Sequence, residues 1–90
     1  MGLQPGQYEK ILKVLRDVAQ ECEKARKKHP PLHSTHEAAK VIEEEYEEWW
    51  DSVKADKPDD KELIQVAAMA VMAIVELEGQ NVNPYYEKPQ

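Results

Sequence analysis

The stretch IEEEYEEWWD, residues 42–51, decides how this chain folds, because it joins an apolar stripe to a dense run of carboxylates. When the stretch is wound at about 100° per residue, its isoleucine and both tryptophans share one direction with two alanines one turn earlier. Glu45 and Glu48 lie on one flank of this stripe, three residues apart, so their carboxylates can converge at the edge of a packed surface. The pattern predicts a helix over residues 35–53.

A separate helix is expected before this one. Apolar residues recur at spacings of three and four from Gln7 onward, which predicts a helix over residues 7–28. A Pro-Pro pair ends it, because proline donates no backbone hydrogen bond and disfavours helical geometry in the residue before it. Ser34 and Glu37 then have the spacing of a capping box that opens the next helix. The stripe of the first helix comprises Tyr8, Ile11, Leu12, Leu15, Val18, Ala19, Cys22 and Ala25.

The C-terminal part of the chain predicts a third helix, over residues 60–78. Asp59 and Glu62 have the spacing of a second capping pair, and from residue 63 to residue 75 every side chain is apolar except Gln65. A helix that is apolar on all sides must be covered on all sides. Two partner helices from the same short chain cannot do this, so we expect a second subunit to pack against it.

The expected architecture is therefore all-α. A single domain over residues 1–90 forms a three-helix protomer, with a loose leader over 1–6 and a tail over 79–90, and protomers assemble into a dimeric helical bundle. The sequence does not choose between a dimer and a tetramer.

Composition excludes several classes of partner. The 90 residues carry a formal net charge of −6, which repels nucleic acid polymers and anionic membranes. The apolar run of the third helix is shorter than the roughly 20 residues needed to span a bilayer. With one cysteine, Cys22, and no secretory signal, a cytoplasmic location is expected. A divalent cation reverses the local field, so a metal-bound nucleotide stays compatible with an acidic protein.

Basic and imidazole side chains gather where the first helix ends. Four cations in its last turns complement the helix dipole, which is the favoured interpretation, and contact with a phosphate is the alternative. His29, His33 and His36 straddle the Pro-Pro pair without a fourth ligand nearby, so a solvent-exposed linker is favoured over a zinc site. Contact with the polar edge of a ligand lies between these two interpretations. The four cations are Lys24, Arg26, Lys27 and Lys28.

The carboxylates of the central stretch call for a stabilising partner. Like charges at neighbouring helical positions destabilise by a few tenths of a kcal/mol per pair. A solvated acidic face is one explanation, but Glu45 and Glu48 border the apolar stripe and Gln65 places an amide in an apolar helix, where it needs a partner. Oxygen donors from two adjacent helices suit Mg²⁺, or Mn²⁺, with the remaining positions left to water and phosphate.

At these residues the sequence resembles a family. Glu44-Glu45-x-x-Glu48, then thirteen residues, then Glu62-x-x-Gln65 is similar to the EExxE and ExxD pattern of the MazG-type all-α nucleoside triphosphate pyrophosphohydrolases. The resemblance covers about residues 34–77, and HSxHE at 33–37 further resembles short, phage-type members. It implies a helical dimer, or a dimer of dimers, that hydrolyses a nucleoside triphosphate between the α and β phosphates with Mg²⁺.

The resemblance also implies roles for individual residues. Glu45, Glu48 and Glu62 would be metal ligands together with Gln65, and Glu44 a further ligand or the group that orients the attacking water. The catalytic set is then the four glutamates. The sequence departs from the family pattern at Gln65, where an Asp is usual, and a neutral amide removes one negative charge from the site.

Two alternatives therefore remain open. The chain is either a competent enzyme with a modified metal shell, or a non-catalytic dimeric helical module whose acidic face binds a partner protein. Glu62 likewise has a structural alternative, as the partner of Asp59 in the capping pair.

Overall fold

The computed structural model describes residues 2–78, and in this range the chain forms three α-helices and no strand. The helices are α1 (Gln7–Lys28), α2 (Thr35–Lys54) and α3 (Asp60–Glu76). This confirms the all-α, three-helix prediction. The helix predicted to reach residue 78 ends two residues earlier, because Leu77 leaves helical geometry while its N–H still bonds to the Ala73 carbonyl. The predicted tail over 79–90 lies outside the described residues.

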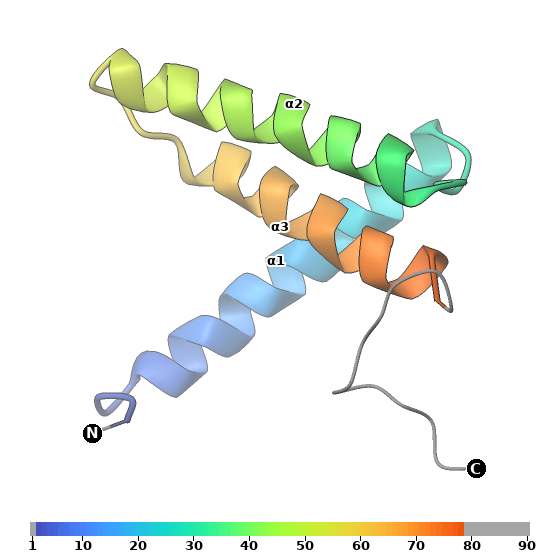
Figure 1. Cartoon of the computed structure of the whole chain (residues 1–90). Helices are drawn as coiled ribbons and strands as arrows, with labels where there is room; N and C mark the ends of the chain where they lie inside the picture. The colour runs from blue at the N-terminus through green and yellow to red at the C-terminus, as the bar shows by residue number, and fades with distance from the viewer. Residues whose placement is uncertain (1, 79–90) are drawn as a thin grey trace, which may run out of the picture.

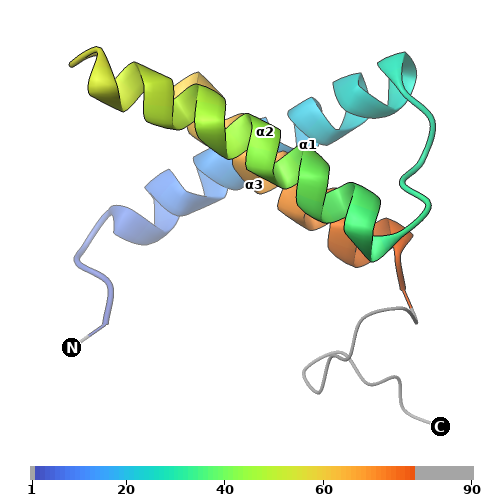
Figure 2. The same ribbon diagram turned by 45° about the horizontal axis from the view of Figure 1, so that its top comes forward.

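Helix α3 lies between the other two helices (Figure 1). α2 runs antiparallel along one side of α3, and α1 crosses α3 on the other side, as the turned view in Figure 2 also shows. Within residues 2–78, α1 and α2 do not pack directly on one another. The second half of α1 crosses α3, whereas the first half extends away from the α2 and α3 pair (Figure 1).

The capping box predicted at the start of α2 is present with one change. Ser34 Oγ accepts a hydrogen bond from the Glu37 N–H at 3.1 Å, as expected. Glu37 Oε1 accepts from the backbone N–H of His33 at 2.7 Å, one residue before the expected donor. The box therefore also orders the end of the connector between α1 and α2.

The capping pair predicted at the start of α3 is half wrong. Asp59 Oδ1 accepts from the Lys61 N–H at 2.9 Å, so Asp59 does cap the helix. Its own N–H, which Glu62 was expected to bind, instead donates to Ser52 Oγ at 3.1 Å. Ser52, from the end of α2, thus takes over the reciprocal half of the box. The Glu62 side chain has no part in this cap.

A small core forms where the helices cross. Ala68 of α3 is 0% exposed, and the buried Ala38 and Val18 come from α2 and α1. Met72 and Leu77 are the other buried apolar residues between positions 2 and 78. Small side chains at a crossing let helix backbones approach closely, so the alanines decide where α3 meets its neighbours.

Cys22 belongs to the α1 side of this crossing. Its thiol is half-buried and donates to the Ala68 carbonyl at 3.6 Å. Burial raises the pKa of the Cys22 thiol above its ordinary value, and the nearby Glu76 carboxylate adds to this effect. The residue therefore acts as a small packing group, as its place on the stripe predicts.

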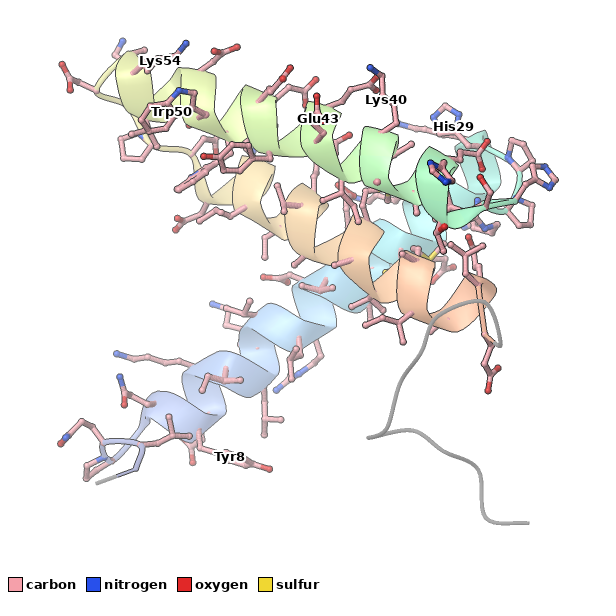
Figure 3. All side chains as sticks on the ribbon, viewed as in Figure 1. Tyr8, His29, Lys40, Glu43, Trp50 and Lys54 are labelled. Atoms are coloured by element: carbon pink, nitrogen blue, oxygen red, sulfur yellow. The ribbon has the colours of Figure 1, made fainter. Side chains whose placement is uncertain are left out.

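Much of the apolar surface of the helices stays uncovered. On α1, Tyr8 is 62% exposed, and it lies at the end of the helix that extends away from the others (Figure 3). On α3, Val75 is also 62% exposed. Further exposed apolar side chains are Ile11, Leu12, Val14 and Leu15 on α1 and Val71 and Ile74 on α3. Each helix therefore carries a row of exposed apolar side chains, whereas an ordinary surface shows them singly.

Candidate metal centre and adjoining groove

Three carboxylates predicted from the sequence converge in the structure. Glu45 and Glu48 come from neighbouring turns of α2, and Glu62 comes from the first turn of α3. One oxygen from each of the three side chains lies within 4.8 Å of the others. The antiparallel packing of α2 on α3 brings the groups together, and the cap made by Ser52 leaves Glu62 free to face α2. We call these three residues the glutamate cluster.

The glutamate cluster contains polar atoms without partners. Glu45 and Glu62 are half-buried, and the Oε2 atom of each is inaccessible to solvent and accepts no hydrogen bond within the described chain. Trp49 Nε1, on the same helix, is also buried without an acceptor. Buried polar atoms are almost always paired, because leaving one unpaired costs on the order of 1–3 kcal/mol. The oxygens of the cluster therefore call for a proton or a cation.

The electrostatics of the glutamate cluster point in the same direction. Burial raises the pKa of Glu45 to about 7, and the carboxylates of Glu48, Glu62 and Glu44 add to the increase. Burial also raises the pKa of Glu62, together with the nearby charges of Glu48 and Asp59. The three side-chain ion pairs among residues 2–78 all lie elsewhere, so no lysine or arginine of this range forms an ion pair with the cluster.

A groove of about 530 Å³ adjoins the cluster. It runs between the end of α1, the Pro-Pro connector and the facing sides of α2 and α3, and Glu45 belongs both to its wall and to the glutamate cluster. Two further residues predicted for the site, Glu44 and Gln65, line this groove, with Gln65 half-buried and Glu44 exposed. Lys24, Lys28 and His29, from the C-terminal end of α1 and its cap, also line the groove.

An ion pair that the sequence analysis missed holds the connector beside the groove. Arg26 of α1 pairs with Glu76 at the end of α3, where Arg26 Nε donates to Glu76 Oε2 at 2.6 Å. Glu76 Oε1 also accepts from the Leu32 N–H at 3.0 Å. Arg26 Nη1 donates to the carbonyls of His29 and Pro30 at 2.7 and 2.8 Å. The only hint in the sequence was that Glu76 is the first charged residue after the apolar run of α3.

The histidines do not form a metal cluster. Among residues 2–78, the glutamate cluster is the only group of three histidine, cysteine or carboxylate side chains whose ligand atoms converge. His29 is exposed and lines the groove, and His33 and His36 are exposed near the start of α2. This agrees with the favoured interpretation of a solvent-exposed linker.

None of the helices described over residues 2–78 has the length and apolar character needed to cross a membrane. No known protein family, no curated protein and no solved structure matches this chain.

Proposed function

We propose that this chain is a Mg²⁺-dependent nucleotide pyrophosphohydrolase that cleaves a nucleoside or deoxynucleoside triphosphate between the α and β phosphates, releasing a monophosphate and pyrophosphate. One observation carries the proposal: Glu45, Glu48 and Glu62 converge within 4.8 Å, and two of their buried oxygens have no partner in the described chain. The likeness of their spacing to the motifs of MazG-type pyrophosphohydrolases suggests the reaction class.

The donor set fits a hard divalent cation. Carboxylate oxygens suit Mg²⁺, with Mn²⁺ as an alternative, and Mg²⁺ uses few protein ligands because it keeps several waters. Glu45, Glu48 and Glu62 would hold the ion, with the amide oxygen of Gln65 as a further donor. When bound, the ion neutralises phosphate charge and lowers the pKa of a bound water.

Glu44 has a different part in the proposal. It lines the groove beside Glu45, but it is exposed and lies outside the glutamate cluster. An exposed carboxylate accepts a hydrogen bond from a water and can orient it towards a phosphate lying in the groove. We therefore assign to Glu44 the orientation of the attacking water.

A homodimer is part of the same proposal. The exposed apolar rows of α1 and α3 need a cover, and a second copy carries matching rows that a two-fold axis would bring together. A tetramer would extend the same arrangement. Light scattering at micromolar concentration should give at least twice the 10.4 kDa mass of the chain, and a monomeric mass would refute this part of the proposal.

The test of the activity is pyrophosphate release from a panel of canonical and modified nucleoside triphosphates, with and without Mg²⁺ or Mn²⁺. We expect metal-dependent release with a monophosphate product. Glu45→Gln and Glu48→Gln should each lower turnover at least 100-fold in folded protein, whereas Glu47→Gln, an exposed glutamate outside the cluster, should not. Unchanged turnover in either cluster variant would refute the assignment of the site to the glutamate cluster.

The second candidate is a non-catalytic dimeric module that binds a partner through its acidic face. The neutral Gln65 in the groove favours it, because a neutral ligand weakens the hold on a hard cation. No release of pyrophosphate from folded, dimeric protein would select this function. We place the protein in the cytoplasm under either proposal, in keeping with its single cysteine, Cys22.

A further inference from the structure

The charge balance of the groove leaves a polyanionic substrate short of positive partners. The glutamate cluster has three carboxylates, so one bound divalent cation leaves it with a negative charge when all three are ionised. Glu21, Glu37 and Glu44 add further carboxylates to the lining of the groove. One cation therefore cannot by itself hold a triphosphate chain against this wall.

The basic residues of the groove are not equivalent. Three lysine and arginine side chains line the groove, but Arg26 already binds Glu76 and two connector carbonyls. Lys24 and Lys28 form no ion pair within residues 2–78, and both are exposed. They are four residues apart on α1, so they lie on the same face of the helix, with Cβ atoms about 6 Å apart.

We propose that Lys24 and Lys28 form an anion-binding wall that holds the phosphate chain of the substrate across the groove from the glutamate cluster. The inference rests on the proposed function for the identity of the substrate, and on the groove and its charges for the binding itself. Two ammonium groups on one face of α1 contact neighbouring phosphates of the chain, while Glu44 and Glu45 line the groove from α2. The terminal phosphates are thereby fixed in the groove.

The ordinary explanation for these lysines is that they complement the C-terminal dipole of α1. Lys27 separates the two explanations, because it lies in the same turns of α1, is exposed, pairs with Glu23 and does not line the groove. A dipole effect predicts similar behaviour for all three lysines. An anion-binding wall predicts that only Lys24 and Lys28 affect the binding of a phosphate chain.

The experiment is a calorimetric titration of the full chain with inorganic tripolyphosphate in Mg²⁺, at two salt concentrations. We expect the double variant Lys24→Gln/Lys28→Gln to bind at least tenfold more weakly than the original protein and with a smaller salt dependence. Lys27→Gln should stay within twofold, and the double variant Lys24→Arg/Lys28→Arg should keep most of the affinity. All are exposed substitutions and should leave the fold unchanged.

Three results would overturn the inference: no binding of tripolyphosphate to the original protein, equal binding by the double glutamine variant, or an equal loss in Lys27→Gln. The outcome is separate from that of the proposed function. Binding that depends on Lys24 and Lys28 without any turnover would keep the wall and reject the enzyme. Turnover with an unchanged KM in the double glutamine variant would keep the enzyme and reject the anion-binding wall.

Discussion

Replacing Glu45 by Gln should stabilise the metal-free protein at pH 8, although the residue belongs to the proposed site. Burial and three neighbouring glutamates raise the pKa of Glu45 from 4.5 to about 7. Between these values the unfolded chain has released the proton that the folded chain still holds, so stability falls as pH rises. Below pH 4.5 both states are protonated and the penalty is absent. Above pH 7 both are ionised and the full penalty remains.

The size of the effect follows from the same values. Each tenfold change in proton affinity corresponds to about 1.4 kcal/mol, so a pKa raised from 4.5 to about 7 corresponds to at most about 3 kcal/mol. Water screens a carboxylate that is only half-buried, so we expect a stabilisation of about 1 to 2 kcal/mol for Glu45→Gln at pH 8. For a domain of this length that is a rise in Tm of about 6 to 10 °C. The same substitution should change Tm by less than about 2 °C at pH 4.

The assay is thermal unfolding at pH 4 and pH 8 in the presence of a chelator, at one protein concentration because the proposed dimer would make Tm depend on it. Glu47→Gln is the matched control, since it removes a charge from the same helix at an exposed position outside the cluster. Its Tm should move by less than half as much. A lower Tm for Glu45→Gln than for the original protein at pH 8 would refute the account of the cluster as a site of unrelieved repulsion.

Three further predictions concern the cation, the connector and the assembly. Millimolar Mg²⁺ should raise the Tm of the original protein more at pH 8 than at pH 6, because at pH 6 the ion competes with the proton on Glu45. The variant Glu45→Gln should lose most of this increase in Tm. An equal increase at both pH values would contradict competition with a proton. Glu76→Gln should destabilise by about 2 kcal/mol in urea unfolding, because it leaves the partly buried Arg26 without its countercharge; a loss below about 0.5 kcal/mol would show that the pair does not hold the connector. Leu15 lies on the exposed apolar row of α1, so Leu15→Glu should shift the mass measured by light scattering to that of a monomer. The helix content measured by circular dichroism should not change. A dimer that survives this substitution would place the interface elsewhere.

The glutamate cluster could be predicted in part from local sequence spacing. Glu45 and Glu48 could be placed on one flank from their spacing alone, because side chains three residues apart share a helix face. Their meeting with Glu62 was predicted from the helix order and the likeness of the motif. The role of Glu62 in the cap of α3 could not be decided from the sequence, because the acceptor that competes with it for the Asp59 N–H is Ser52 Oγ, seven residues before Asp59. Only the packed turn between α2 and α3 showed that Ser52 takes the place of Glu62.

The sequence by itself determined the three helices and where they begin and end to within two residues, because periodicity, prolines and caps act over at most four residues. The sequence also predicts that α3 needs cover on all sides. The tertiary structure alone decided the groove and the pairing of Arg26 with Glu76, residues 50 positions apart. Those features depend on the angle and register at which α1 crosses α3. That crossing is set by close packing around Ala68, which no spacing along the chain encodes.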